Sequence, residues 1–235
     1  MRTVFILCLT FIYALESYAQ FEGELLYKFN VSSKLIDSLK RGMADSELRE
    51  ATEYFDSLRV FIKGNDYAVW KNNKTDEKNI LIQRNNRIYT IAKVILSRKK
   101  ERILLATDLT NSVYNKDNFT AYNTDAITIS DVDFFSKKCK QYVLKDPAIT
   151  ETFIVADEQD YTTDINKNYL VPPYTGHNLN SPHYTPFRNR IIYYYQLDFN
   201  GFSYSFTLID IKAQKLPESI FIIPLTDKKG IIKEP

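Results

Sequence analysis

The chain has 235 residues, 44% of them hydrophobic and 14% aromatic, which is enough apolar material for one large β domain or two small ones. Tyrosine (17) and phenylalanine (15) are abundant and glycine is scarce (6), and this composition suits long strands better than helical bundles. The formal net charge of +2 excludes a strongly basic nucleic-acid-binding chain and gives no sign of a general attraction to anionic membranes.

The first nineteen residues have the pattern of a signal peptide. Arg2 supplies a short positive n-region, an apolar run follows, and Ser17-Tyr18-Ala19 has the small-x-small form of a cleavage site. We therefore expect a leader at 1–19, a single β-rich domain at 20–235, and export to the periplasm, the cell envelope or the outside. The apolar run is too short for a membrane span, and no later segment predicts one.

A strand and a helical stretch are expected next. Apolar and polar residues alternate in Phe21 to Val31, FEGELLYKFNV, as in a half-buried strand. Ser32 and Ser33 can then cap a helix. The apolar stripe that includes Leu39 and Phe55 predicts one bent helix or two short ones packed on the sheet.

From Leu58 onward the alternation predicts strands. Gly64-Asn65-Asp66 and Asn85-Asn86 are hairpin turns. Trp70, the only tryptophan, shares a side with Ala68, which favours a place in the core or at its rim. The expected strands are Leu58–Lys63, Tyr67–Lys71, Asn79–Gln83, Arg87–Ile91, Arg102–Thr107, Ala126–Ile129, Cys139–Lys145, Thr152–Ala156 and a short closing strand Ile220–Ile223.

The segment 161–189 is expected to be a long loop. It holds four of the eight prolines and both histidines, and long loops are usually functional. His177 and His183 are six residues apart, which is neither the helical nor the strand spacing of a metal pair. The sequence therefore predicts solvated histidines, no metal site and no cofactor.

The stretch Arg190 to Ile211, RIIYYYQLDFNGFSYSFTLIDI, predicts the hairpin around which the chain is organised. Asn200-Gly201 is a strong signal for a two-residue turn in which both residues have positive φ. Folding the strands about that turn places the large side chains on one face, since alternate residues share a face. The facing pairs are Phe199 with Phe202, Leu197 with Tyr204, Tyr195 with Phe206, and Tyr193 with Leu208.

Three short motifs resemble a group of secreted bacterial proteins of uncharacterised function. They are Phe21-x-Gly23-x-x-x-Tyr27, Lys138-Cys139-x-x-Tyr142 and the closing Phe221-x-x-Pro224. The order of segments is similar to that of proteins related to the family named GLPGLI after its Gly-Leu-Pro-Gly-Leu-Ile segment. That resemblance implies a half-open antiparallel barrel covered by helices, as in the lipoprotein carriers LolA and LolB, and it implies no catalytic residues.

Cys139 is the only cysteine that remains once Cys8 leaves with the leader, so no intramolecular disulfide is expected. As a nucleophile Cys139 would need a basic partner, but on a strand Lys138 and Lys140 point away from it. The sequence therefore favours an inert buried thiol. The common catalytic motifs are missing, and a non-enzymatic role is favoured without excluding an enzyme.

The aromatic hairpin face either lines a ligand cavity or fills a core. Counting the resemblance, the sequence predicts a mainly β protein with a curved antiparallel sheet or half-open barrel that binds an apolar or amphiphilic ligand such as a lipid. The expected ligand-binding residues are Tyr193, Tyr195, Leu197, Tyr204, Phe206 and Leu208. The alternative is an interaction module that binds a protein partner through a sheet edge or the 161–189 loop. A hydrolase is the third hypothesis, and no nucleic-acid partner is expected.

Overall fold

The computed structural model describes residues 19–32, 34, 37, 57–71, 79–85, 87–96, 99–108, 127–145, 149–156, 161–163, 169–170, 190–199 and 201–233. Within these residues the chain forms thirteen strands and one short 3-10 helix. They are β1 (Ala19–Gln20), β2 (Glu22–Val31), β3 (Ser57–Lys63), β4 (Asp66–Lys71), β5 (Asn79–Arg84), β6 (Arg87–Leu96), β7 (Lys99–Asp108), β8 (Ile127–Phe134), β9 (Lys137–Lys145), β10 (Ile149–Ala156), β11 (Tyr161–Thr162), β12 (Ile192–Phe199), β13 (Phe202–Ala213) and η5 (Glu218–Phe221).

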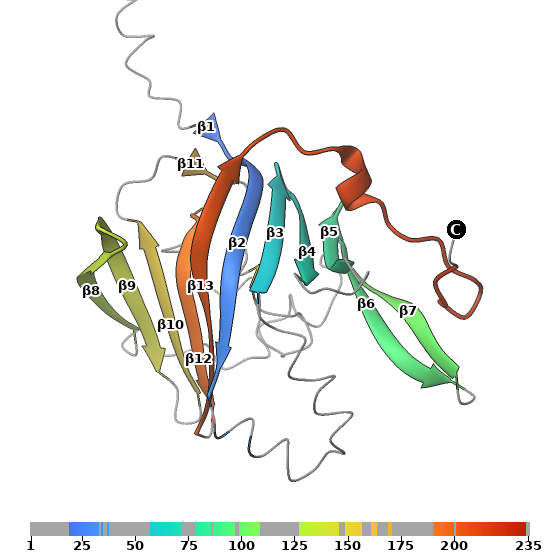
Figure 1. Cartoon of the computed structure of the whole chain (residues 1–235), viewed down its shortest axis with the longest axis horizontal. Helices are drawn as coiled ribbons and strands as arrows, with labels where there is room; N and C mark the ends of the chain where they lie inside the picture. The colour runs from blue at the N-terminus through green and yellow to red at the C-terminus, as the bar shows by residue number, and fades with distance from the viewer. Residues whose placement is uncertain are drawn as a thin grey trace, which may run out of the picture.

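Eleven strands form one antiparallel sheet in the order β7-β6-β5-β4-β3-β2-β13-β12-β10-β9-β8, and β1 pairs separately with β11 (Figure 1). The sheet is not closed into a barrel, because its two end strands, β7 and β8, do not pair with each other. The predicted fold class, a mainly β protein built on an open antiparallel sheet, is confirmed. The predicted helices fall almost entirely outside the described residues.

The core lies on both faces of the sheet. The larger cluster covers what we call the inner face, and it includes Leu25, Tyr27, Phe153 and Tyr195. A smaller cluster on the opposite, outer face contains Phe61, Ala68 and Ile82 from β3, β4 and β5, together with Leu216, Ile220 and Phe221 from the C-terminal segment. Side chains of the middle strands therefore alternate between two apolar layers.

The organising hairpin has the predicted register. Tyr195 pairs with Phe206, Leu197 with Tyr204 and Phe199 with Phe202, and Gly201 has a φ of 81°. The regular pairing stops at Tyr194 and Thr207, one step before the fourth predicted pair. The β12–β13 pairing ends where the neighbouring ladders become irregular. The β10–β12 register shifts between Ile154 and Val155, and the β13–β2 register shifts between Leu208 and Asp210.

Two local predictions are corrected. The expected closing strand at Ile220–Ile223 begins instead as the 3-10 helix η5, which follows Pro217 and turns both Ile220 and Phe221 toward the outer-face cluster. A strand would send these two neighbours to opposite sides. The expected strand at Ala126–Ile129 is also too short, because β8 continues to Phe134 and turns into β9 through Phe135 and Ser136.

The C-terminal segment runs from the end of β13 across β3, β4 and β5 and reaches the edge strand β7 (Figure 1). There Ile231 bridges to Ile103, and the Ile232 amide donates to the Arg102 carbonyl over 2.8 Å. The Leu104 amide donates to the Gly230 carbonyl over 3.0 Å. This segment therefore covers part of an edge that would otherwise offer unpaired backbone groups.

Candidate functional site

A row of aromatic side chains crosses the inner face of five neighbouring strands. The pairings of β9, β10, β12, β13 and β2 place its members side by side, and we call them the aromatic row: Tyr142, Phe153, Tyr195, Phe206 and Phe29. Ring centroids are 4.8 Å apart for Phe153 and Tyr195, and 5.0 Å apart for Phe29 and Phe206. Rings at these separations attract one another as well as burying apolar surface.

The six predicted ligand-binding residues lie on or beside this row, but they are not equally accessible. Tyr195 is 0% exposed, and the other buried members are Tyr193, Leu197, Phe206 and Leu208. Tyr204 is half-buried, and its ring centroid lies 6.0 Å from that of Phe29 and 5.8 Å from that of Phe206. Of the six, Tyr204 alone is placed to touch a molecule that arrives from solvent without displacing the core.

Exposure of the inner face increases toward the turn of the organising hairpin. Phe29, Tyr204 and Ile149 are half-buried and pack against the main cluster, and Phe199, which pairs with Ile149, is 43% exposed. We call these four residues the hairpin end. The packed aromatic row thus continues into apolar surface that reaches solvent.

Sequence reasoning missed a carboxylate inside this apolar layer. Glu151 on β10 is 1% exposed, and its Oε1 accepts a hydrogen bond from the Tyr195 hydroxyl over 2.8 Å. Its strand neighbours across the ladders are Leu144 and Leu197. The only signal was its place in the alternation, since Glu151, Phe153 and Val155 share a side. A buried carboxylate needs such donors, because burial without them is costly.

Three tyrosines close the other end of the inner face. The Tyr27 hydroxyl donates to the Ile192 carbonyl over 2.7 Å, and the Tyr169 hydroxyl accepts from the Ile192 amide over 3.0 Å. The two hydroxyls are themselves 3.0 Å apart, which completes a closed set of hydrogen bonds. Tyr67 packs edge-on against Tyr169 at 6.3 Å. Residues 169 and 170, part of the predicted long loop, are therefore anchored on the sheet.

This environment changes the acidity of the three phenols. Burial raises the pKa of Tyr169 to about 12, and burial also holds the pKa values of Tyr67 and Tyr27 well above the usual range. Neighbouring Tyr169 adds to the effect on Tyr27. The hydroxyls therefore stay protonated, which the hydrogen bond that Tyr27 donates to the Ile192 carbonyl requires.

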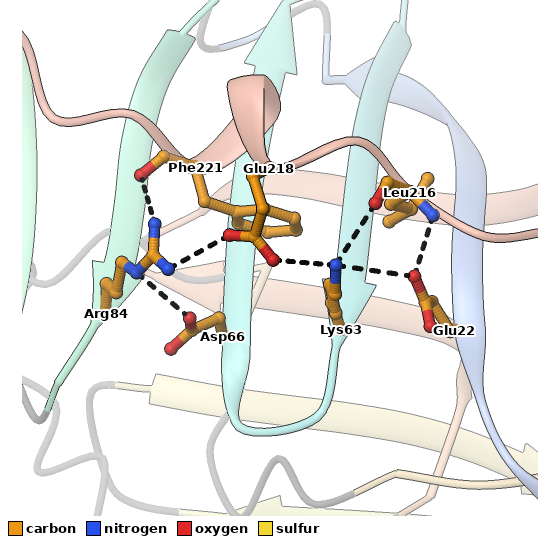
Figure 2. Close-up of polar contacts among 7 residues, drawn as sticks. All are labelled: Glu22, Lys63, Asp66, Arg84, Leu216, Glu218 and Phe221. Atoms are coloured by element: carbon orange, nitrogen blue, oxygen red, sulfur yellow. Dashed lines mark hydrogen bonds and ion pairs between the residues drawn. The ribbon is translucent and has the colours of Figure 1, made fainter.

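On the outer face, ion pairs hold the C-terminal segment in place (Figure 2). Glu218 accepts from Lys63 Nζ over 2.7 Å and from Arg84 over 3.0 Å, so it joins the ends of β3 and β5. Lys63 also donates to the Leu216 carbonyl over 3.2 Å. The Leu216 amide in turn donates to Glu22 over 2.7 Å. We call Leu216, Glu218, Ile220 and Phe221 the C-terminal latch.

The latch also covers the only tryptophan. Trp70 belongs to the edge of the outer-face cluster, with its ring centroid 4.5 Å from that of Phe61. It lies on the same side of β4 as Ala68, as the alternation predicts.

The hydrogen bond from Lys63 is the main cause of a lowered Glu218 pKa, so this carboxylate is charged at neutral pH.

The cysteine and histidine candidates do not form a site in the described part of the chain. Cys139 is 1% exposed, while Lys138 and Lys140 form ion pairs with Asp133 and Asp131. Lys137 Nζ lies 3.4 Å from the Tyr193 hydroxyl. His177 and His183 lie outside the described residues. Among the residues that are described, no three His, Cys, Asp or Glu side chains gather as metal ligands would.

No family model matches the chain, and no curated protein is significantly similar to it. The resemblance to the GLPGLI-related proteins and the lipoprotein carriers therefore remains a prediction from the three motifs. Over the described residues, no helix combines the length and apolar character that a membrane crossing requires.

Proposed function

We propose that this protein is a non-enzymatic, exported envelope protein that binds an apolar or amphiphilic ligand on the inner face of its sheet. One observation carries the proposal: the aromatic row continues from fully buried Tyr195 to half-buried Phe29 and Tyr204 at the hairpin end. Small-molecule sites are mostly apolar and aromatic, with few polar groups. The hairpin end has this composition and borders the buried core.

In this proposal the predicted residues Tyr204, Tyr195 and Phe206 have two different roles. Tyr204 contacts the ligand directly, together with Phe29 and Ile149. Buried Tyr195 and Phe206 support that contact surface, because their rings lie 6.3 Å and 5.8 Å from the ring of Tyr204. Substitution of Tyr204 should therefore affect binding more than stability, and substitution of Tyr195 should affect both.

The test compares two half-buried tyrosines of the organising hairpin. Tyr204→Ser removes a ring from the hairpin end, and Tyr194→Ser removes a ring that packs near Phe134 at 6.0 Å. Titration with a dansyl-labelled fatty acid should give saturable binding to the wild type, about tenfold weaker binding to Tyr204→Ser, and unchanged binding to Tyr194→Ser. Equal binding by all three proteins, or by none, contradicts the proposal.

Export is part of the same proposal, and it rests on the leader pattern at 1–19. Gln20 pairs with Thr162 in the β1–β11 ladder, so a chain that starts at Gln20 keeps part of that pairing. Mass spectrometry of the protein from the cell envelope should find Gln20, cyclised or not, at the N-terminus. A full-length product in the cytoplasm would contradict export.

A second candidate function is a protein-interaction module that uses the edge strand β8. In the described chain β8 pairs only with β9, and its Ile129 is 57% exposed. An edge strand can accept an additional strand from a partner. Replacing Ile129 by lysine should abolish such pairing in a pull-down from envelope extracts while leaving fatty-acid binding unchanged, which separates the two functions.

A further inference from the structure

The turn between β8 and β9 has an unfavourable residue in a demanding conformation. Phe135 and Ser136 form a two-residue connection, and their φ angles are 50° and 61°. A turn with positive φ at both central residues favours Asn and Gly, the pair that the sequence has at positions 200 and 201. A bulky residue such as Phe is rare in this region, because its side chain crowds the backbone. Selection of Phe at this position therefore calls for a reason.

Packing does not provide that reason. The Phe135 side chain is 61% exposed, and its ring centroid lies 4.5 Å from that of the adjacent Phe134. Phe134 is half-buried and packs against the main cluster, and its ring centroid lies 6.0 Å from that of Tyr194. The turn therefore presents one strained, exposed aromatic ring beside half-buried aromatics.

Two basic residues, Lys137 and Lys138, follow this turn directly in sequence. Lys138 is paired with Asp133 at 2.7 Å, but the two side chains are 82% and 68% exposed, so the pair is weak and easily exchanged for another anion. Lys137 is also exposed. The β8–β9 hairpin lies at one edge of the sheet, and the C-terminal segment lies at the opposite edge, beside β7 (Figure 1). The tip therefore combines an exposed aromatic ring with a highly exposed cation whose ion pair is weak, at the end of the sheet opposite to β7.

We propose that Phe135 and Lys138 form a membrane-docking tip, with the Phe135 ring in the headgroup–acyl boundary of an anionic phospholipid bilayer and Lys138 beside a lipid phosphate. Interfacial binding strengthens with the apolar area that enters the bilayer and with attraction to anionic lipids. The net charge of +2 gives little long-range attraction, so docking is local and reversible. This role goes beyond ligand binding and does not rest on it.

The test measures partition of the purified protein onto vesicles of phosphatidylcholine alone and of phosphatidylcholine with phosphatidylglycerol. Phe135→Asn removes the ring and places a residue suited to positive φ at the turn. It should lower the partition coefficient about tenfold and leave the melting temperature equal or higher. Lys138→Gln should weaken binding only to the anionic vesicles.

The control is Leu225→Asn, which removes a 79% exposed apolar side chain from the C-terminal segment at the opposite end of the sheet. It should bind vesicles as the wild type does. The proposal is overturned if the wild type does not bind vesicles, if Phe135→Asn binds as well as the wild type, or if both Asn variants lose binding equally. A lowered melting temperature of Phe135→Asn would also overturn it, because the ring would then be structural. The proposal is also overturned if Phe135→Asn loses binding to a protein partner but binds vesicles as the wild type does.

Discussion

Lys63 donates a hydrogen bond to Glu218 over 2.7 Å, and this contact joins residues 155 positions apart in the chain. It fixes the start of the C-terminal latch above the end of β3, while Arg84 holds the same carboxylate from β5. The polar contacts orient the latch, and Phe221, fully buried, supplies its apolar anchor. Two predictions separate these contributions.

Replacing Phe221 by alanine should destabilise the protein by about 3–5 kcal/mol, as expected for a large-to-small change at a buried site. Urea unfolding followed by far-UV circular dichroism measures the loss. Because Trp70 belongs to the same cluster, its fluorescence should also shift to longer wavelength in the native baseline of the variant. A wild-type midpoint with an unchanged Trp70 spectrum would show that the latch is not anchored by Phe221.

Replacing Glu218 by glutamine should have a much smaller effect on the unfolding midpoint than Phe221→Ala has. The ion pairs are solvent-accessible, since the Glu218 side chain is 62% exposed, and water and salt screen them. The difference between Glu218→Gln and the wild type should shrink further as sodium chloride is raised toward 1 M. A loss as large as that of Phe221→Ala would mean that charge, not apolar burial, holds the segment.

Replacing Gly23 by alanine should destabilise the sheet strongly, because β2 and β13 approach closely there. A Cβ at position 23 would stand 2.1 Å from the Lys212 carbonyl oxygen and 2.9 Å from the Phe21 ring. A backbone oxygen in a ladder cannot move aside cheaply, so the loss should reach about 3 kcal/mol or more. The melting temperature measures it, and an unchanged value would contradict the β2–β13 register.

Replacing Tyr195 by phenylalanine keeps the ring of the aromatic row and removes the hydroxyl that donates to Glu151. A buried carboxylate that loses a donor should cost about 1–3 kcal/mol of stability. The matched control is Tyr194→Phe, which removes a half-buried hydroxyl that donates to Gln196. Its unfolding free energy should change less. The opposite order would show that Glu151 does not depend on Tyr195.

Alkaline pH should destabilise the fold through the buried tyrosines. Burial raises the pKa of Tyr169 to about 12, and the pKa values of Tyr27 and Tyr67 are also raised from the ordinary 10.0. Between about pH 10 and 12 the unfolded chain has released protons that the folded chain still holds, so stability falls as pH rises. Below pH 10 their contribution is complete.

Two readouts test this dependence. The urea midpoint should decrease above pH 10, and part of the tyrosinate absorbance near 295 nm should develop only when the protein unfolds. A chain that shows its full tyrosinate absorbance at pH 11 while still folded would contradict the burial of these three phenols.

The sequence predicts the sheet well where alternation and turn residues agree. The Asn200-Gly201 hairpin and its register follow from the turn type and the period of two. The β8–β9 turn could not be predicted, since Phe135 and Ser136 carry none of the usual signals of positive φ. The 3-10 form of η5 was equally hidden, because it depends on contacts with Phe61 and Trp70, which are remote in sequence.

The candidate site was predictable in part. The alternation correctly places Tyr195, Leu197, Tyr204 and Phe206 on one face, but it cannot distinguish fully buried Tyr195 from half-buried Tyr204. That difference depends on how strands from distant segments pack around each residue. Glu151 was missed because the alternation puts it on the side of Phe153 but does not tell how completely that side is covered.

The most direct test of ligand binding is a calorimetric titration of the wild-type protein with dodecanoate below its micelle concentration at several temperatures. Binding on the aromatic inner face predicts a saturable one-site isotherm with a negative heat-capacity change, since apolar surface of the ligand and of the hairpin end leaves water. Tyr204→Ser should weaken this isotherm. The absence of saturable heat at every temperature, with the protein folded throughout, would contradict the proposed function.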